Sequence, residues 1–408
     1  MFFVKTALIQ LISEQTMQNL LPVLALKPDK VFHLSTPKMS ARSPNIVEAA
    51  KKARVDTVLD DFYLSEMPRI NEVSEAVMQS IDQARNLGLN PVVNFTGGTK
   101  LMSIGAYEAA MREQVSSLYV DTDHREFLDG GTGGKLKTLL GDNLGFEPIQ
   151  KDLTLDVIGL ANGGKKINGG GNWKSFLALA QYLFDSPDVE DQVWDAIHGK
   201  QGLCPGGKEP RDASNWLELL NININLPGSV GELALKAGII CKVGSVFRLP
   251  QETRHSLETL AKEKIGNYFS AIRPLQFSLA FLSGAWWEVV VADAAERCQR
   301  FNDLRWSVNV SGSQNSAVRE EDIIGLDGVQ VAYFSCKRGG QKQRLLSQLD
   351  ELNNRAQSIG GRFTRRFLAV YKHLAEKPAA ELQRRASEMG VKIIKPEDLN
   401  NPSFFAEG

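Results

Sequence analysis

The sequence has few of the residues that mark secreted, membrane-spanning or zinc-binding proteins. Only four of its 408 residues are cysteines, and no two of them form a CxxC pair. Widely separated cysteines are typical of reduced cytosolic thiols, which argues against a disulfide framework and against a zinc site. The apolar run from Phe281 to Val291 is broken by Glu288 and is too short to span a bilayer. We therefore expect a cytoplasmic protein with no membrane segment.

An excess of charge of either sign is also missing. The chain has 47 Lys and Arg against 48 Asp and Glu, a net charge of −1. Any contact with nucleic acid would therefore depend on local basic clusters rather than on the field of the whole protein. The apolar residues 1–12 lack the basic start and the small-residue cleavage site of a signal peptide, so we interpret them as a buried first strand.

The first third of the chain alternates apolar strands with amphipathic helices. Strands are predicted at residues 4–12, 30–35, 57–59, 91–95 and 117–121, and helices at 16–26, 45–53, 70–86 and 99–112. This alternation is typical of an open, doubly wound α/β sheet. In such sheets, ligands bind at the carboxyl ends of the strands, near the point where the strand order reverses.

Three loops with polar residues follow predicted strands and are candidates for that ligand site. The candidate residues are Ser13, Glu14, Gln15 and Thr16 in the first loop, Ser35 and Thr36 in the second, and Asn94, Thr96, Gly97, Gly98, Thr99 and Lys100 in the third. Two glycines allow a ligand close to the backbone of the third loop, and Thr99 can cap the next helix. Free N–H groups and Lys100 would suit a phosphate. From spacing alone, a simple tight turn fits equally well.

Known nucleotide motifs are missing from this loop. Neither the GxxxxGK[ST] spacing of a P-loop nor the GxGxxG spacing of a dinucleotide site is present, so the sequence supports neither ATP nor NAD.

Acidic residues and a lysine are concentrated on a predicted hairpin at residues 319–337. Glu320 and Asp322 open its first strand, and Ser335 and Lys337 share a face at the end of its second. A helix expected at residues 282–300 brings Glu288 as another carboxylate. Acids and a lysine in this arrangement can hold a divalent cation beside a phosphate. From spacing alone, the same charges fit an ordinary solvated strand end.

The middle of the chain is expected to form a small unit of its own. Two helices between residues 215 and 236 precede a hairpin at 238–249, an order that resembles a winged helix. Few basic residues lie on the second helix, which favours a packing role over DNA binding.

Three stretches resemble parts of one family of effectors. NFTGGTKLMSIGAYEAA (residues 94–110) is similar to the ligand loop and helix of CARF domains, the Rossmann-like sensors of cyclic oligoadenylate in type III CRISPR defence. FLSGAWWEVVV (281–291) and EEDIIGLDGVQVAYFSCK (320–337) resemble the restriction-endonuclease-like half of CARF nucleases. The resemblance implies an α/β protein with a CARF sensor at 1–150, a winged-helix-like module at 151–265 and a PD-(D/E)xK nuclease domain at 266–408.

The resemblance also implies roles for individual residues. Its catalytic set is Glu288, Glu320, Asp322, Ser335 and Lys337, and its ligands for Mg²⁺ or Mn²⁺ are Glu288, Asp322 and the backbone carbonyl of Cys336. Ser335 departs from the family pattern, which commonly has Glu or Asp two residues before the lysine. Basic clusters flank the site and could contact a nucleic-acid backbone; they are Arg338, Lys342 and Arg344, and Arg362, Arg365 and Arg366.

The implied function is a homodimeric, metal-dependent nuclease. A cyclic oligoadenylate, with cyclic tetra-adenylate the leading candidate, would activate it to cleave DNA or RNA or both. Two alternatives stay open at this point. One is a ligand-responsive transcription regulator that binds DNA through the middle module, and the other is a ring nuclease that degrades the cyclic nucleotide in the sensor pocket.

Overall fold

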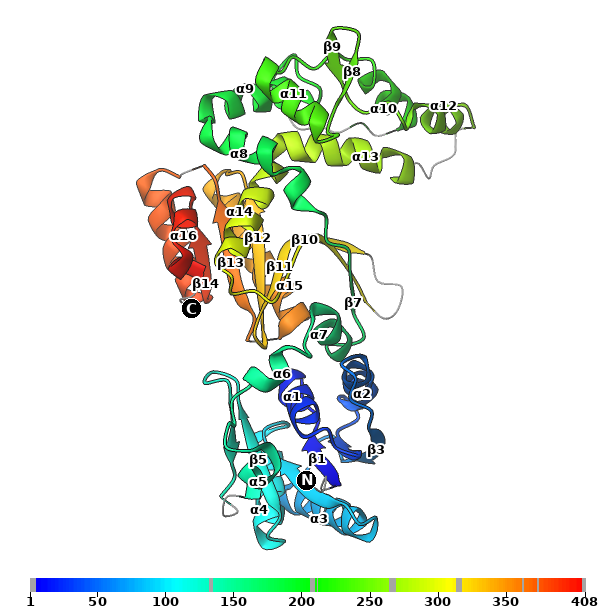
Figure 1. Cartoon of the computed structure of the whole chain (residues 1–408), viewed down its shortest axis with the longest axis vertical. Helices are drawn as coiled ribbons and strands as arrows, with labels where there is room; N and C mark the ends of the chain where they lie inside the picture. Colours follow the sequence, from blue (N-terminus) through cyan, green and yellow to red (C-terminus); the bar gives the residue numbers. More distant parts are fainter. Residues whose placement is uncertain are drawn as a thin grey trace.

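Three tiers follow one another along the long axis of the molecule (Figure 1). The computed structural model describes residues 5–131, 135–205, 210, 212–263, 269–312, 318–361, 363–372 and 374–405. The lower tier holds a first six-stranded sheet, the middle tier a second six-stranded sheet, and the upper tier helices with a small hairpin.

The lower tier is an α/β domain with strand order β3-β2-β1-β4-β5-β6. Its strands are β1 (Thr6–Leu11), β2 (Lys30–Ser35), β3 (Val58–Tyr63), β4 (Asn90–Asn94), β5 (Ser116–Asp121) and β6 (Glu126–Asp129), and its main helices are α1 (Met17–Leu26), α2 (Ser43–Lys52), α3 (Ile70–Asn86) and α4 (Lys100–Arg112). All neighbouring strands are parallel except β5 and β6. Helices α3 and α4 pack on one face and α1 and α2 on the other, which confirms the doubly wound fold.

Strand β6 was not predicted. It returns antiparallel to β5 through a turn at residues 122–125, where Arg125 takes a positive φ of 59°. The turn contains no Gly, so the usual hairpin signal is missing from the sequence.

The middle tier is a mixed sheet of order β14-β13-β12-β11-β10-β7. Its strands are β7 (Lys166–Asn168), β10 (Asp303–Ser311), β11 (Arg319–Asp327), β12 (Gln330–Lys337), β13 (Arg365–Val370) and β14 (Val391–Ile394), and its helices include α14 (Trp286–Arg297), α15 (Lys342–Gly360) and α16 (Glu376–Glu388). The predicted hairpin is present as β11 and β12, whereas β10 was missed. Strand β7 pairs with β10, although it lies in the segment assigned to the middle module.

The two faces of this sheet bury different helices. Side chains of α14 pack with Trp306, Ile323 and Phe334, while side chains of α15 pack with Ile324 and Tyr333. The continuous helical segment Ala271–Arg297 is long and apolar enough to cross a membrane by length and composition, with a mean hydropathy of 1.3 in its most apolar window. Most of that window is buried inside the protein, and Trp286 and Trp287 are fully covered.

The upper tier contains the segment that resembled a winged helix. Its helices are α8 (Leu177–Asp185), α9 (Pro187–His198), α10 (Ala213–Leu219), α11 (Gly228–Lys236), α12 (Arg254–Glu263) and α13 (Phe269–Ala280), and its hairpin is β8 (Cys241–Val243) with β9 (Val246–Arg248). The expected helices and hairpin are therefore present. Although this segment is central in the sequence, it lies at the end of the molecule opposite the first sheet (Figure 1).

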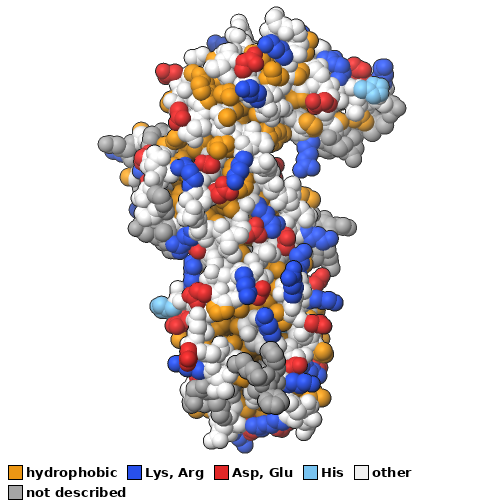
Figure 2. Space-filling model, in the orientation of Figure 1, with side chains coloured by type: hydrophobic (Ala, Val, Ile, Leu, Met, Phe, Trp, Pro, Cys, Tyr) orange, Lys and Arg blue, Asp and Glu red, His pale blue; other side chains and the backbone are white. Residues whose placement is uncertain are grey.

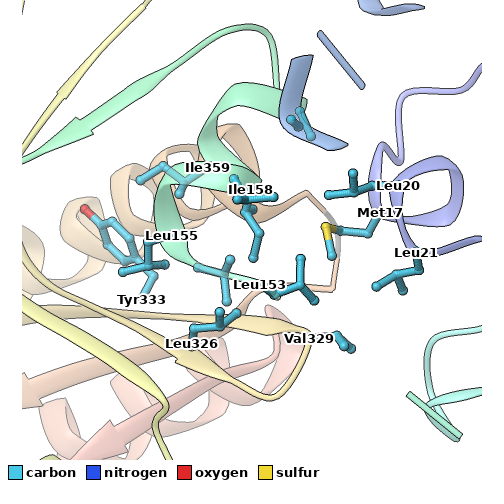
Figure 3. Packing of buried hydrophobic residues seen from close by; sticks show 14 of the residues in the cluster. Met17, Leu20, Leu21, Leu153, Leu155, Ile158, Leu326, Val329, Tyr333 and Ile359 are labelled. Carbon is cyan, nitrogen blue, oxygen red and sulfur yellow. The ribbon is translucent and has the colours of Figure 1, made fainter. Parts of the chain in front are cut away.

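The first two tiers share one continuous hydrophobic core. Met17, Leu20 and Leu21 of α1 belong to the same buried cluster as Leu326 of β11 and Tyr333 of β12. Figure 3 shows how Leu153, Leu155 and Ile158, from helix α7 (Leu155–Ala161) and the residues before it, lie between the two groups. Burying apolar area at roughly 25 cal/mol per Å² makes such a contact stabilising. Helix α1 of the lower tier is thus joined, through α7 and the residues before it, to the hairpin that carries Asp322.

Candidate functional site

A large pocket lies where the strand order of the first sheet reverses. Strands β1 and β4 are neighbours there, with β2 and β3 on one side and β5 on the other. The pocket has a volume of about 1280 Å³. Its lining includes these predicted ligand residues: Ser13, Glu14, Gln15, Thr36, Thr96, Gly98, Thr99 and Lys100. The structure therefore brings all three predicted loops to one pocket.

The other four predicted residues do not line the pocket but shape it. Ser35 and Asn94 are fully buried. Asn94 donates to the Gln18 carbonyl at 2.8 Å and accepts from the Thr96 hydroxyl at 2.7 Å. Thr16 is buried and donates to Asn162. The hydrogen bonds of Asn94 and Thr16 hold the ligand loops from the protein interior, whereas the buried Ser35 hydroxyl has no hydrogen-bond partner among the described residues.

The fourth of these residues, Gly97, belongs to a glycine pair that is required by close packing and backbone shape. A Cβ on Gly97 would lie 2.1 Å from the carbonyl oxygen of Leu11, and Gly98 has a φ of +77°. Thr99 then caps α4, since its Oγ1 accepts from the Met102 N–H at 3.4 Å. The predicted cap is confirmed. The loop therefore directs free N–H groups at the start of α4 toward the pocket side.

Cationic side chains outnumber acidic ones around the pocket. Its lining contains Lys38, Arg42, Arg69, Lys100 and Lys165 against Glu14 and Glu66. Figure 2 shows basic side chains grouped on the drawn face at the height where the first and second tiers meet. Such a lining suits an anionic ligand. Only Lys100 was predicted; Lys38 and Arg42 follow the second loop within two turns, a spacing that could have suggested them.

The second candidate site is centred on Asp322. The β11–β12 pairing ends at Ile323 and Phe334, and beyond it the carboxylate of Asp322 takes over as hydrogen-bond acceptor. Its Oδ2 accepts from the Cys336 N–H at 2.6 Å and from Lys337 Nζ at 3.1 Å. Ser335 Oγ lies 3.4 Å from the same oxygen. The predicted acid, hydroxyl and lysine are thus gathered at one strand end.

An irregularity in strands β10 and β11 accompanies this arrangement. Trp306 pairs with Ile323 and Val308 pairs with Glu321, which leaves Ser307 and Asp322 unpaired between them. Ser307 has a positive φ of 51°. Trp306 and Val308 consequently lie in the cores on opposite faces, although they are two residues apart. The pairing register is the same before and after this gap, so the two strands are locally distorted beside Asp322 without a β-bulge.

Glu288 faces this cluster from α14. The indole N–H of Trp306 donates to its Oε2 at 2.9 Å. Burial and the nearby charge of Asp322 raise the pKa of Glu288 well above its usual value, while Lys337 opposes that shift. Burial lowers the pKa of Lys337, but Asp322 and its neighbours more than offset this and hold it above the usual value. Trp306 was missed because β10 was missed; the apolar alternation of Leu304, Trp306, Val308 and Val310 could have identified both.

Glu320 lies further from the centre than the other predicted acids. It is exposed, and the Ser307 hydroxyl donates to its Oε1 at 2.6 Å. Its charge contributes to raising the pKa of Glu288, after burial and Asp322. Within the described ranges, no three His, Cys, Asp or Glu side chains form a metal-binding group. The acidic groups nearest the centre of this site are Glu288 and Asp322, whose charges act on each other.

The basic clusters turn out to be largely paired. Arg338 donates to Glu190 Oε2 at 2.9 Å, and Lys372 also contacts Glu190, so the end of β12 is tied to α9 of the upper tier. Arg365 is buried and donates to Asp327 at 2.8 Å. Arg366 donates to the Met389 carbonyl and Lys342 pairs with Glu381, while Arg344 is exposed and Arg362 lies outside the described residues. The prediction that Arg365 contacts nucleic acid is wrong, because its side chain is buried.

Comparison with known proteins identifies the lower tier. Residues 7–138 match the family model of the Card1 CARF domain. This part of the chain is a CARF domain. The resemblance inferred from the TGGTK loop is thereby confirmed, and the pocket described above is the pocket of a CARF domain. No curated protein matches the chain in sequence.

Solved structures share the fold over nearly the whole chain. Can2 from Sulfobacillus thermosulfidooxidans, in complex with cyclic tetra-adenylate, is 17% identical with a TM-score of 0.68, covering 97% of this chain and 98% of its own. Protein VC1899 from Vibrio cholerae is 14% identical with a TM-score of 0.66, covering 98% and 97%. The CARF domain therefore belongs to a larger α/β architecture that these structures have in common.

Proposed function

We propose that this protein is a nuclease that is activated by a cyclic oligoadenylate, most simply cyclic tetra-adenylate, in cytoplasmic type III CRISPR defence. The observation that carries the proposal is one chain with both a cationic CARF pocket and the Asp322–Lys337 pair on a hairpin. Can2, which has the same fold, was solved with cyclic tetra-adenylate bound. Phosphodiester bonds in DNA, RNA or both would be the substrate.

The donor set at Asp322 suits Mg²⁺ or Mn²⁺. Carboxylates of Glu288 and Asp322 and the carbonyl of Cys336 are hard oxygen ligands, and such ions keep several waters besides a few protein ligands. A bound divalent ion would neutralise the scissile phosphate and lower the pKa of an attacking water. The raised pKa of Glu288 supports this role, because two nearby carboxylates favour a cation between them.

The chain's own residues would position the reactants. Lys337 stays cationic beside Asp322 and would stabilise negative charge that develops on the phosphate. Trp306 holds the Glu288 carboxylate in place through its indole N–H. Ser335 would orient Asp322 rather than bind the metal, since its hydroxyl lies 3.4 Å from the Asp322 carboxylate.

We also propose a homodimer formed through α4. Four apolar residues on one side of this helix are exposed, namely Leu101 (52%), Ile104 (50%), Tyr107 (38%) and Met111 (41%). Their spacing of three or four residues makes a continuous stripe. Thr99 and Lys100 of the pocket stand at the start of the same helix. Pairing of two copies here would bring two pockets together around one symmetric ligand.

A nuclease assay tests the catalytic proposal. Purified protein should cleave single- or double-stranded DNA or RNA only with cyclic tetra-adenylate and Mn²⁺ or Mg²⁺ both present. Asp322→Asn and Lys337→Met should each reduce the rate by about 10²–10³-fold or more, because each removes charge at the reacting phosphate. Asp185→Asn, an exposed acid in the upper tier, is the matched control and should cleave normally.

Two results would contradict the proposal in different ways. Full-rate cleavage without the cyclic nucleotide would disprove the sensor role. Unchanged cleavage by both Asp322→Asn and Lys337→Met would disprove the site.

A further inference from the structure

One wall of the CARF pocket comes from outside the CARF domain. Asn162, Gly163 and Lys165 reach it from the segment between α7 and β7, and Gln357 and Ser358 from the last turn of α15. The match to the CARF family ends at residue 138, before all of these positions. A ligand in the pocket can therefore touch the tier that carries Asp322 as well as the sensor.

Asn162 fixes this wall between the two tiers. Its Oδ1 accepts from the hydroxyl of Thr16, and its Nδ2 donates to the Ile359 carbonyl at 2.6 Å. Thr16 is the residue before α1 and ends the first ligand loop, while Ile359 lies in the last turn of α15. Both hydrogen bonds are buried, and a buried bond is costly to leave unmade. The segment leading to Lys165 is thus held in a defined position.

Lys165 lies on this wall, and none of the charged side chains near it forms an ion pair with it among the described residues. Arg42 faces it from the start of α2, and Arg319 and Glu321 face it from β11. Burial, helped by the two arginines, lowers the pKa of Lys165 to about 8, and Glu321 only partly opposes this. The carboxylate of Glu321 instead accepts hydrogen bonds from Arg355 at 3.1 Å and from the Tyr333 hydroxyl. Among the described residues, Lys165 has no ion-pair partner.

We propose that Lys165 and Arg42 bind a phosphate group of the anionic ligand and that Lys165 thereby couples the pocket to strand β11. The inference rests on the proposed function, which supplies the cyclic oligoadenylate as ligand. A phosphate beside Lys165 offsets the repulsion from Arg42 and gives the ammonium a charged hydrogen-bond acceptor. It also weakens the electrostatic attraction between Lys165 and Glu321, the residue before Asp322. Ligand binding thus changes the electrostatic surroundings of the catalytic strand.

Affinity for cyclic tetra-adenylate tests the assignment. Calorimetric titration of the full chain without metal should give a Kd about 10–100-fold weaker for Lys165→Gln than for the natural protein, because a charged hydrogen bond is lost. Lys165→Arg should recover most of the affinity. Lys166→Gln is the control, since this neighbouring lysine is exposed, lies outside the pocket lining and removes the same unit of charge.

The pH dependence gives a second readout. A bound phosphate raises the pKa of Lys165, so the complex binds a proton that the free protein has lost above about pH 8. Affinity of the natural protein should therefore fall as the pH rises from 8, and Lys165→Gln should lack this decline.

The outcomes separate this inference from the function beneath it. A Lys165→Gln variant that remains folded and binds like the natural protein overturns the assignment of Lys165, as does equal weakening by Lys166→Gln. If the natural protein binds no cyclic oligoadenylate, the proposed function itself is overturned.

Discussion

At the scale of single residues, Asp327 shows how many interactions one residue at a turn can make. In the sequence it is one residue of the turn between two strands. In the structure its carboxylate accepts from Arg125 at 3.2 Å, Arg300 at 2.6 Å and Arg365 at 2.8 Å. Burial tends to raise its pKa, but Arg125 and Arg300 hold the pKa of Asp327 below the usual value. Because Arg125 belongs to the CARF domain, the cluster joins the two lower tiers.

Asp327→Asn should destabilise the protein by about 3–5 kcal/mol at pH 7, since it leaves buried Arg365 and partly buried Arg125 and Arg300 without a counter-charge. The folded-state pKa is lowered, so the stabilisation is present above the ordinary Asp pKa of about 4 and is lost as the pH falls below it. Urea unfolding at pH 7 and pH 3 should therefore show a difference between variant and natural protein that shrinks in acid.

Asp350→Asn is the control for this measurement. Its carboxylate pairs with Arg385, and both side chains are about half exposed (55% and 45%). Exposed pairs contribute only about 0–1 kcal/mol, so this variant should unfold almost like the natural protein. Equal effects of the two substitutions would show that the Asp327 cluster has no special role.

At the scale of elements, the loop between β4 and α4 is the part of the pocket whose shape its own residues explain most fully. Its glycines are required by a close approach to β1 and by a positive φ, and its threonine caps the helix. The Rossmann-like strand order places this loop beside the one after β1. Local sequence and topology therefore act together to shape the ligand-binding edge.

Gly97→Ala should damage this loop. The added Cβ would meet the Leu11 carbonyl at 2.1 Å, so the backbone has to move, at a cost of about 1–3 kcal/mol in stability. Thermal unfolding should report that loss, and titration with cyclic tetra-adenylate should show weaker binding. Gly228→Ala, where a Cβ meets nothing within 4 Å, should change neither property. Undiminished affinity in Gly97→Ala would mean that the ligand does not depend on this loop.

At the scale of the whole molecule, the order of the tiers differs from the order of the sequence. The segment around residues 169–263 lies at one end, beyond the second sheet, and leaves the CARF domain in direct contact with the hairpin of Asp322 (Figure 1). The upper tier therefore does not separate the CARF domain from this hairpin. The assignment of that segment as a winged-helix unit stays a prediction. Its contacts with the second sheet include the ion pair between Glu190 and Arg338, the residue after β12.

The proposed dimer is also a property of the whole molecule. Replacing two of the exposed apolar residues of α4, as in Leu101→Glu with Ile104→Glu, should give monomers, because like charges would then face each other across the twofold axis. Light scattering after gel filtration measures this directly. Exposed Val243→Glu, in the hairpin of the upper tier and outside the pocket lining, is the control and should remain dimeric. A natural protein that is already monomeric with cyclic tetra-adenylate bound would rule out the shared-ligand arrangement.

Much of the fold could be predicted from the sequence because its signals are local. The helix at residues 70–86 and the strand at 30–35 agree with α3 and β2, and the hairpin of Asp322 is present. Strands β6, β7 and β10 were missed, since they are short, lack turn glycines or pair with distant partners. Because β10 was missed, Trp306, which donates a hydrogen bond to Glu288, was missed as a site residue.

The sequence by itself was enough to predict candidate residues for the pocket and for the hairpin site, because glycines before a helix, acids at a strand start and a lysine at a strand end are short patterns. Which side chains lie opposite these residues was decided only by the tertiary structure. Arg125 meets Asp327 across 202 positions, and Lys165 lines a pocket built by a domain that ends before it. Such contacts depend on how whole sheets pack, and no local pattern records that packing. The proximity of the pocket to strand β11 is therefore visible only in the folded protein.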